Sequence, residues 1–371
     1  MNSMSLKIKR LLFILHLPPP VHGAAMVGKF IHDSKLIHEQ FECRYINLTT
    51  ASSLEDIGKV GVSKLKAFGK LLESIRKEVR EFKPDLVYVT PNARGGAFYK
   101  DFVVVQMLKS FGCKVVVHYH NKGVSTRQDK WLDNLLYKIF FNNIKVILLG
   151  KSLYQDVKKY VKWENVYICP NGISVEKEKE KSPRAEENAV PRLLFLSNLI
   201  ESKGVIVLLD ALKIMKEKGY SFVCDFVGGE TAEIDAKRFE EEVTKRELNN
   251  TAIYQGRKYG EDKIKVYQQA DISLLPTYED CFPLVLLEAM EQGLPCVTTN
   301  EGAINDIIDD GVNGLIAERK NAQSLAEKIE ILLNDNELRI RMGEQGNAKF
   351  YREFTLDKFE KRMCEILMHL S

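Results

Sequence analysis

Short apolar strands alternate with helices along this chain, and the whole series occurs twice. The first series opens at residues 9–16, an apolar run that stops at three successive prolines, and it continues to residue 169. The second series starts at Arg192. Because strands buried on both faces of a parallel sheet are almost unbroken apolar runs, the sequence predicts two α/β domains, each with a doubly wound parallel sheet.

The apolar pattern also gives expected bounds for each element. Strands are expected at residues 9–16, 84–89, 114–118, 146–149, 166–169, 192–197, 222–227, 252–254, 272–275 and 296–298. Helices are expected at residues 24–37, 65–82, 98–111, 131–142, 151–161, 205–218, 232–247, 260–270, 283–292, 304–308, 322–334 and 355–370. The helix at 65–82 is basic and amphipathic, with apolar residues at three- and four-residue steps.

Residues 174–191 separate the two series. This segment is highly charged, lacks aromatic side chains and contains Pro183, which is typical of a domain boundary. We therefore expect Rossmann-like domains at 1–185 and 186–354, with a terminal helix at 355–371 that could pack back on either domain. The two domains are expected to face each other across a cleft lined by strand ends, where open α/β sheets bind ligands.

Composition restricts the class of protein. Hydrophobic residues make up 45% and charged residues 28% of the 371 residues, which excludes a disordered or collagen-like chain. The longest apolar runs are far shorter than the ~20 residues of a membrane-spanning helix, and the mostly polar first ten residues do not resemble a signal peptide. The seven cysteines include no C-x-x-C pair, so we expect neither a zinc site nor a disulfide framework, and a reducing cytosolic compartment.

The net charge of +3 conceals two halves of opposite sign. Residues 1–185 hold 31 Lys and Arg against 17 Asp and Glu, whereas the other 186 residues hold 23 against 34. A basic half attracts phosphates, anionic membrane surfaces or nucleic acid, although charge can also vary along a chain without a functional reason. We do not expect nucleic acid, because no aromatic residues are interleaved with the cations as in a recognisable binding module.

One loop joins a buried strand to an unusually apolar helix. Pro283 fits the first turn of that helix, where a missing N–H costs nothing. The N–H groups of Leu284 and Val285 then lack helical acceptors and, with the helix dipole, form an anion site. Burial of Glu288 in this apolar helix is costly unless the carboxylate binds hydroxyls. The alternative is that Asp280 only caps the helix and Glu288 lies on an exposed face.

Three further positions at strand ends could take part in chemistry. Lys203 lies just before a helix, where it can reach a phosphate as a point charge unless it is only a surface lysine. His118 and His120 alternate at a strand end and so point to the same side; they could bind a metal, but no third ligand has clear spacing, and one could instead be a core histidine. Gly23 opens a helix and lets the backbone approach a ligand closely. The dinucleotide fingerprint, the P-loop, G-x-S-x-G and H-E-x-x-H are absent.

Taken together, these segments resemble glycosyltransferase family 4, whose members have the two-domain GT-B fold. The similarity is strongest between residues 193 and 316, in FLSNLIESKGV, FPLVLLEAM and DGVNGL. It extends more weakly to LPPPVHGAAMVGK, VVVHYHNKG and ICPNGI, and so covers nearly the whole chain. The resemblance implies a retaining enzyme that uses a nucleotide sugar as donor and needs no catalytic metal or other cofactor.

The resemblance also implies which residues hold the donor. In the family's E-x7-E motif, Glu288 would bind the ribose hydroxyls, and Asp280 occupies the first position, where a carboxylate contacts the transferred sugar. The backbone N–H groups of Phe282, Leu284 and Val285 would bind the donor phosphates.

Other positions follow the family pattern less closely. Lys203 matches a phosphate-binding lysine, but Asn198 stands where the family usually has an arginine, and Arg257 or Lys258 on a neighbouring loop could compensate. His120 matches a histidine near the transferred sugar.

Four glycine positions of the family are only partly kept. Gly23 matches a glycine near the leaving phosphate, with His22 in place of the glycine before it. Gly302 and Ala303 match a Gly-Gly loop, which we place with His118 on the acceptor or loop side.

The implied reaction transfers a hexose-type sugar to a glycan or lipid-linked glycan, in the synthesis of a surface polysaccharide or lipopolysaccharide. A hexosyltransferase of this kind works at the anionic inner face of the cell membrane, so the basic half and the helix at 64–83 predict a peripheral, cytoplasmic membrane protein. Two alternatives remain open. One is a nucleotide-sugar 2-epimerase on the same fold, and the other is a non-catalytic nucleotide-sugar-binding scaffold.

Overall fold

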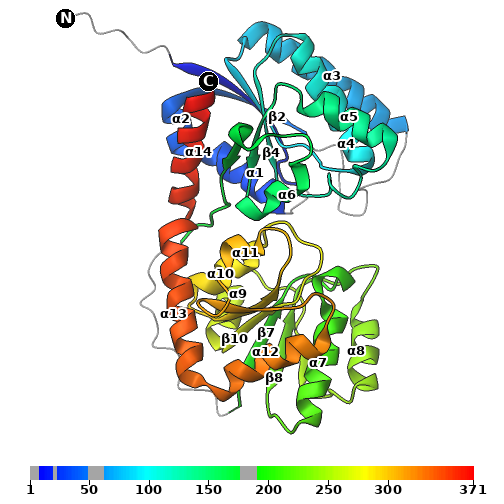
Figure 1. Ribbon diagram of the computed structural model, residues 1–371, viewed down its shortest axis with the longest axis vertical. Coiled ribbons are helices and arrows are strands. Elements are labelled where there is room, and N and C mark those ends of the chain that lie inside the picture. The colour runs from blue at the N-terminus through cyan, green and yellow to red at the C-terminus, as the bar shows by residue number, and fades with distance from the viewer. Residues whose placement is uncertain (1–7, 20–22, 49–61, 176–189) are drawn as a thin grey trace, which may run out of the picture. The chain divides into compact units, whose positions relative to one another are not determined.

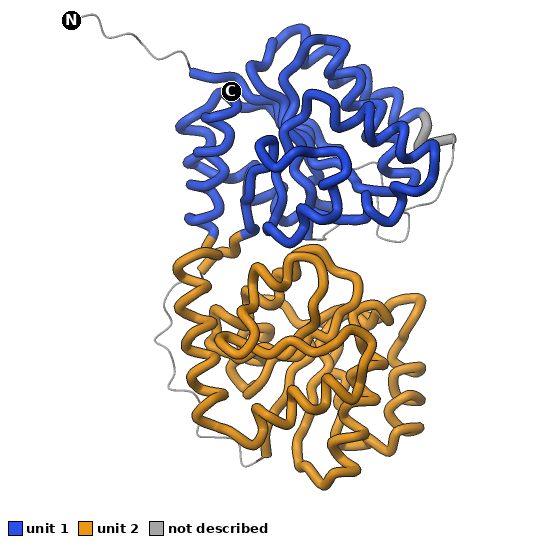
Figure 2. The backbone as a smooth tube through the Cα atoms, in the orientation of Figure 1, with its two compact units in different colours: residues 1–171, 356–371 blue, residues 172–355 orange. Residues whose placement is uncertain are grey.

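The chain folds into two compact units. The computed structural model describes residues 8–19, 23–48, 62–175 and 190–371. Unit 1 consists of Met1–Asn171 and Leu356–Ser371, and unit 2 consists of Gly172–Thr355 (Figure 2). The boundary thus falls after Asn171, earlier than the expected residue 185, because the Ile173 N–H already donates to the Phe354 carbonyl of unit 2 at 3.0 Å. Most of the expected linker, residues 176–189, lies outside the described residues.

Six parallel strands form the sheet of unit 1 among its described residues, in the order β2-β1-β3-β4-β5-β6. Figure 1 labels β2 and β4 of this sheet. Their bounds are β1 Lys9–Leu15, β2 Phe41–Asn47, β3 Leu86–Val89, β4 Val115–Tyr119, β5 Lys145–Leu148 and β6 Val166–Ile168. The short apolar runs therefore form buried parallel strands, as predicted. The sequence analysis missed β2, an edge strand in which only Phe41 and Ile46 are buried.

Helices connect these strands. They are α1 Gly23–Asp33, α2 Lys35–Gln40, α3 Val62–Phe82, α4 Gly95–Ser110, α5 Trp131–Phe141, α6 Tyr154–Val157 and α14 Leu356–Leu370. The single helix expected at 24–37 is divided at Ser34, whose side chain accepts a hydrogen bond from the Ile37 N–H and so caps a new helix. The helix expected at 151–161 is shorter, with one 3₁₀ turn followed by α6.

Unit 2 repeats the architecture with a different strand order, β12-β11-β10-β7-β8-β9, again all parallel. Its strands are β7 Arg192–Leu196, β8 Val223–Val227, β9 Ala252–Tyr254, β10 Ile272–Leu275, β11 Cys296–Thr299 and β12 Gly314–Ala317. Its helices are α7 Val205–Glu217, α8 Ala236–Lys245, α9 Gly260–Gln269, α10 Leu284–Glu291, α11 Ile304–Ile307, α12 Ala322–Asn334 and α13 Asn336–Glu353. The sequence analysis missed α13 and β12.

The last helix, α14, belongs to unit 1. Phe359, Met363 and Leu367 are fully buried in the same core as Leu11 and Phe13 of β1. They recur at four-residue steps, so one apolar face of α14 packs against unit 1. The helix that follows the whole of unit 2 in sequence therefore completes the core of unit 1.

In each sheet, one pair of neighbouring strands marks the place where the strand order reverses. In unit 2 this pair is β7 and β10, and in unit 1 it is β1 and β3. Open α/β sheets bind ligands at the carboxyl ends of such a pair, because the following connections diverge there. The fold thus predicts where a site should lie in each unit.

Candidate active site

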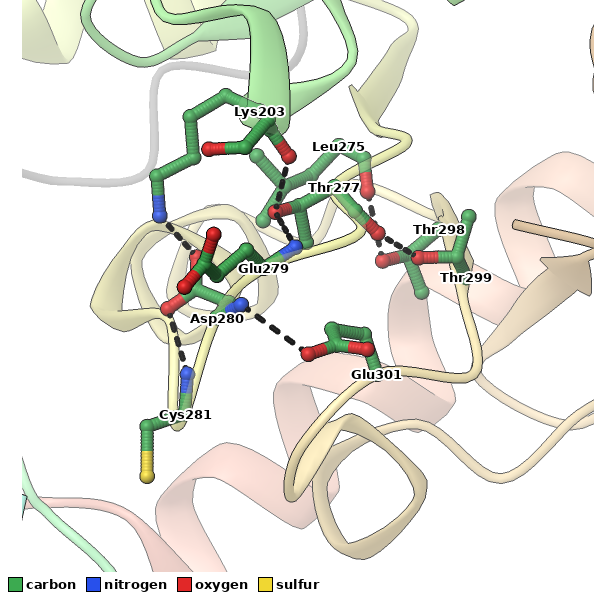
Figure 3. Close-up of polar contacts among 10 residues, drawn as sticks. Lys203, Leu275, Thr277, Glu279, Asp280, Cys281, Thr298, Thr299 and Glu301 are labelled. Carbon is green, nitrogen blue, oxygen red and sulfur yellow. Dashed lines mark hydrogen bonds and ion pairs between the residues drawn. The ribbon is translucent and has the colours of Figure 1, made fainter. Parts of the chain in front are cut away.

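In unit 2, the loops after β7 and β10 are joined by hydrogen bonds. The Tyr278 N–H donates to the Ser202 carbonyl at 2.9 Å, and the buried Thr277 hydroxyl donates to the same carbonyl at 3.1 Å (Figure 3). Gly204 follows, with φ +88°, and a Cβ there would overlap the Pro276 carbonyl. This close approach fixes the loop that carries Lys203 against the loop that carries Asp280.

Lys203 and Asp280 form an ion pair at the meeting point of these loops. The Lys203 Nζ lies 2.5 Å from Asp280 Oδ2 (Figure 3), and both side chains are partly exposed. The other carboxylate oxygen of Asp280 accepts a hydrogen bond from the Cys281 N–H at 2.9 Å. The structure therefore brings together a cation and a carboxylate that are 77 positions apart in the sequence.

The helix α10 starts next to Asp280. We placed Pro283 in the first turn, but the helix begins at Leu284, and Pro283 is its N-cap residue with extended backbone. Within the described residues, the N–H groups of Leu284 and Val285 have no recorded acceptor, and these two residues are partly exposed, whereas Phe282 is buried. Free N–H groups and the positive end of the helix dipole make this terminus suited to an anion. Asp280 does not cap the helix, contrary to the alternative considered above.

Glu288 lies one turn further along α10 and is held by two residues of α9. Lys263 Nζ lies 2.6 Å from Glu288 Oε1, and the Tyr267 hydroxyl donates to Oε2 at 2.8 Å. Burial, reinforced by the nearby Glu288 charge, raises the pKa of Tyr267 well above its usual value, so the hydroxyl keeps its proton and donates. The alternative of a fully exposed Glu288 is therefore wrong.

Sequence reasoning missed both partners of Glu288. Lys263 and Tyr267 are four residues apart on α9 and so share one helical face. That spacing was visible in the sequence, but nothing indicated that this face meets α10.

Asn198 and Arg257 lie on either side of one glycine. The Asn198 side-chain oxygen accepts a hydrogen bond from the Gly229 N–H at 3.0 Å. A Cβ at Gly229 would overlap the Arg257 guanidinium, which therefore passes directly over this glycine. Within the described part of the chain, the guanidinium makes no hydrogen bond or ion pair. Asn198 thus holds the loop through a hydrogen bond to its backbone, whereas Arg257 supplies the exposed positive charge of this region.

The loop after β11 supports Asp280 from the other side. Gly302 has φ +56°, and a Cβ there would lie 2.5 Å from the Asp280 carbonyl oxygen. The Ala303 N–H donates to the Cys281 carbonyl at 2.8 Å. Glu301, which the sequence analysis did not single out, is buried and pairs with Arg319 at 2.6 Å (Figure 3 shows Glu301 beside Asp280). Gly302 and Ala303 therefore shape the loop through backbone contacts.

In unit 1, two histidines lie at the end of β4. The rings of His118 and His120 are 4.2 Å apart, so the two side chains do point to the same side. His118 is fully buried, and its Nδ1 shares a hydrogen bond of 2.7 Å with the Tyr88 hydroxyl. Burial and the neighbouring His120 hold the pKa of His118 well below its usual value, so this ring is neutral. His118 is a core histidine, and the expectation that it faces an acceptor is wrong. His120 is partly exposed.

Gly23 opens α1, and its approach to a ligand stays a prediction. Gly23 is exposed, and a Cβ there would meet nothing within 4 Å. At Gly28, in contrast, a Cβ would overlap the His16 carbonyl, so this glycine lets α1 pack against the end of β1. His22, before Gly23, lies outside the described residues.

In the part of the chain that the structure describes, no three His, Cys, Asp or Glu side chains gather as a metal site would require. None of the helices described there is both long and apolar enough to cross a bilayer.

Two Rossmann-like units, with a helix terminus suited to an anion at the strand-order reversal of unit 2, are the features of the GT-B fold class. Sucrose-phosphate synthase from Thermosynechococcus elongatus matches 98% of this chain and 99% of its own, with 17% identity and a TM-score of 0.75. HepE of Anabaena, solved in complex with UDP, matches 97% of this chain and 100% of its own, with 16% identity and a TM-score of 0.74. At these identities the likeness shows the fold.

The family model described as Glycosyl transferases group 1 matches residues 174–349, almost all of unit 2. The similarity to this family therefore covers most of unit 2. An uncharacterized glycosyltransferase of Methanocaldococcus jannaschii is 31% identical over 230 residues, which are 62% of this chain and 61% of that protein.

A second relative carries a more specific name. The N,N'-diacetylbacillosaminyl-diphospho-undecaprenol alpha-1,3-N-acetylgalactosaminyltransferase of Campylobacter jejuni is 28% identical over 260 residues, 66% of this chain and 64% of that protein. The chain thus spans slightly less than two thirds of either relative. Other relatives are named for the biosynthesis of capsular polysaccharide and amylovoran and for a lipopolysaccharide N-acetylglucosaminetransferase.

Proposed function

We propose that this protein is a retaining glycosyltransferase of family 4 that transfers a hexose-type sugar from a nucleoside diphosphate. One observation carries the proposal: Lys203 lies beside Asp280 at the exposed N-terminus of α10, where the N–H groups of Leu284 and Val285 have no recorded acceptor among the described residues. A diphosphate supplies the negative charge that this terminus and the lysine ammonium favour.

The proposal gives each donor group a partner in unit 2. The diphosphate binds the α10 terminus, Lys203 and Arg257. The ribose hydroxyls bind Glu288, whose carboxylate is already oriented by Lys263 and Tyr267. The hydroxyls of the transferred sugar bind Asp280. Lys203 then leaves its ion pair with Asp280 and binds the phosphate.

The same residues would lower the barrier to transfer. When the anomeric C–O bond breaks, its electron pair leaves with the β-phosphate, and positive charge develops on the sugar ring. The acceptor hydroxyl oxygen forms the new bond to the anomeric carbon, and its proton passes to the leaving phosphate. N–H groups and an ammonium fixed before the reaction stabilise the leaving charge without reorganising, which is the largest contribution in many enzymes. The proposal requires no metal. It assigns His120 to the transferred sugar and Gly23 to the leaving phosphate on the family resemblance alone.

The acceptor proposed here is a glycan or lipid-linked glycan of a surface polysaccharide or lipopolysaccharide. The C. jejuni relative is named for a diphospho-undecaprenol substrate. The helix α3 of unit 1 and the residue after it carry the exposed cations Lys66, Lys70, Arg76, Lys77, Arg80 and Lys83. We propose that the protein works peripherally at the anionic inner face of the cell membrane, to which these cations are attracted.

Donor binding is the direct test. Thermal unfolding would be measured with UDP-, GDP- and ADP-sugars, and a ligand at 100 times its Kd should stabilise the protein by ~2.7 kcal/mol. Sugar transfer from the stabilising donor to a lipid-linked glycan, with the anomeric configuration kept, would support the proposal. Absence of stabilisation by every nucleotide sugar would contradict it.

Two outcomes would redirect the proposal. Release of a free epimer without any acceptor would indicate a nucleotide-sugar 2-epimerase. Tight donor binding with neither transfer nor hydrolysis would indicate a non-catalytic scaffold.

A further inference from the structure

The helix α5 of unit 1 is apolar on its outer face as well as on its inner face. Its inner face buries Tyr137, Phe140 and Phe141 in the core. Its outer face exposes Trp131, Leu132, Leu135 and Ile139, which we call the α5 stripe, with Trp131 76% exposed and the other three 42–46% exposed. Residues 131, 135 and 139 recur at four-residue steps and so follow one side of the helix.

Such a face is unusual on a surface helix. Helices at a protein surface normally direct polar residues outward, and single exposed apolar side chains need no explanation. Here four exposed apolar side chains follow one another along about two turns. Val103 of α4, the helix that packs beside α5, is also 42% exposed. The stripe is therefore an apolar face of α5 that unit 1 leaves exposed.

The stripe is held in place from beneath. Asp133 of α5 is almost fully buried and accepts hydrogen bonds from Arg127 at 2.7 Å and from the Tyr99 hydroxyl at 2.6 Å. The Tyr137 hydroxyl donates to the Ala93 carbonyl at 2.7 Å, in the loop after β3. These bonds fix α5 to unit 1, so its outer residues cannot turn inward without breaking them.

Cations surround the stripe. Lys130 precedes Trp131, and Lys138 lies within the outer face; both are exposed. The exposed Lys159 donates to the Gln128 carbonyl at 3.0 Å and so lies near the start of α5. Asp129 is the exposed acidic residue beside them. The charge around the stripe therefore complements an anionic partner.

We propose that the α5 stripe inserts into the headgroup region of an anionic lipid bilayer. Tryptophan with aliphatic neighbours and flanking lysines suits that interface, since the ring and aliphatic chains enter the acyl boundary and the ammonium groups meet phosphates. A second copy of the chain fits less well. In a two-fold dimer the stripe would face itself and bring the Lys130 and Lys138 groups of both copies together.

This inference rests on the proposed membrane association and makes it more specific. The cations of α3 would attract the protein to the surface, whereas α5 would anchor it there. The loop that carries His120 leads into α5, and Asp156 fixes it by accepting from the N–H groups of Gly123 and Ser125 at 2.8 and 2.9 Å. Membrane insertion of α5 would therefore hold the His120 loop close to lipid-linked acceptors.

The first experiment uses the chain's own fluorescence. The sequence has two tryptophans, so Trp163→Phe leaves Trp131 as the only one. With vesicles of phosphatidylglycerol at low salt, we expect the Trp131 emission to shift to shorter wavelength and to be quenched by brominated acyl chains. With phosphatidylcholine vesicles the shift should be much smaller. An unchanged Trp131 emission on vesicles that do bind the protein would overturn the proposal.

The second experiment compares matched variants in vesicle sedimentation. Leu135→Ser with Ile139→Ser should lower binding to phosphatidylglycerol vesicles roughly tenfold, because affinity follows the apolar area inserted. Ile331→Ser with Ile340→Ser changes two equally exposed residues of unit 2 and should change nothing. Because all four positions are exposed, circular dichroism and the melting temperature should match wild type.

Two further readouts separate the possible failures. If Lys70→Glu with Lys77→Glu abolishes binding and the stripe variant does not, α3 alone is the contact and the inference is wrong. If sedimentation equilibrium shows a dimer that the stripe variant loses, the occupant is a second copy. Donor binding, measured by thermal shift, should be unaffected by the stripe variant. If the wild-type protein binds no nucleotide sugar, the proposed function is contradicted, whereas the result with lipid vesicles still holds.

Discussion

Units 1 and 2 have similar sheets but carry different kinds of side chain where the strand order reverses. In unit 2 the reversal holds Lys203, Asp280 and the free N–H groups of α10. In unit 1 the strands beside the reversal carry the buried Tyr88 and His118, which bond to each other. All seven histidines of the chain lie in unit 1, and unit 2 has none. The comparison teaches that topology fixes where a site can form, whereas the residues at the strand ends decide its chemistry.

The strongest test of this comparison removes the charged groups of unit 2. Lys203→Ala and Glu288→Ala should each remove ~2–4 kcal/mol of transition-state stabilisation. Each variant should therefore lower kcat/KM for sugar transfer about 30- to 1000-fold. Steady-state kinetics would measure the loss. Lys213→Ala, which removes a half-exposed lysine from the same unit, is the control. Near-normal turnover in both variants would place the site elsewhere.

A second test compares one glycine in each unit at which two backbone segments approach closely. Gly28→Ala in unit 1 and Gly204→Ala in unit 2 each place a methyl group against a carbonyl oxygen and should cost about 1–3 kcal/mol of stability. Both tryptophans lie in unit 1, so their fluorescence reports unfolding of that unit, while calorimetry reports both.

The two glycine variants should therefore differ in readout. Gly28→Ala should lower the midpoint of the tryptophan transition, and Gly204→Ala should lower a calorimetric transition without moving the tryptophan midpoint. If both variants move the tryptophan midpoint equally, the units unfold together and the comparison between them fails for stability. Gly96→Ala in α4, where a Cβ meets nothing within 4 Å, is the control.

The third test uses pH. Burial holds the pKa of His118 well below its usual value of about 6.5. Below pH 6.5 the unfolded state therefore binds a proton that the folded state does not, and the stability of unit 1 should fall by ~1.4 kcal/mol per pH unit as pH decreases further. Denaturant unfolding followed by tryptophan fluorescence between pH 7.5 and 5 would measure this slope. His118→Gln should flatten it, and an unchanged slope would remove His118 as its cause.

The smallest expected effect concerns the cation beside Asn198. Arg257→Ala should raise the KM for the donor about fivefold, or ~1 kcal/mol, because its guanidinium crosses Gly229 and has no hydrogen bond or ion pair in the described residues. Lys258→Ala tests the neighbouring cation and should have less effect. A larger effect of Lys258→Ala would assign the compensating charge to that residue.

The apolar runs were sufficient to predict most of the strands, because a strand covered on both faces is mostly apolar. The short strand β12 was missed although three of its four residues are buried. The edge strand β2 escaped prediction, since the neighbouring charged residues Glu42 and Arg44 interrupt its apolar pattern. The helix α13 escaped as well, because its apolar positions are few: Met342 and Phe350 are buried beside two glycines and the stem of Lys349. Edges and glycine-lined contacts depend on partners that are distant in sequence.

The site could be predicted only in part, because its contacts also depend on how distant segments of the chain pack together. Lys203 and Asp280 could be expected at strand ends, but their meeting depends on the pairing of β7 with β10. The pairing of Glu288 with Lys263 and Tyr267 depends on how α9 packs against α10. His118 was misassigned because its spacing from His120 gives the direction of the side chain and not its burial.

The return of α14 to unit 1 has a consequence for synthesis on the ribosome. Strand β1 is made before unit 2, yet Phe359 and Met363, which share its core, emerge only after all of unit 2 has been translated. Until α14 is made, nascent unit 1 exposes the apolar surface that α14 will cover, and chaperones can bind it. Unit 2 can already fold at that stage. The segment translated earlier is thus the one that matures later.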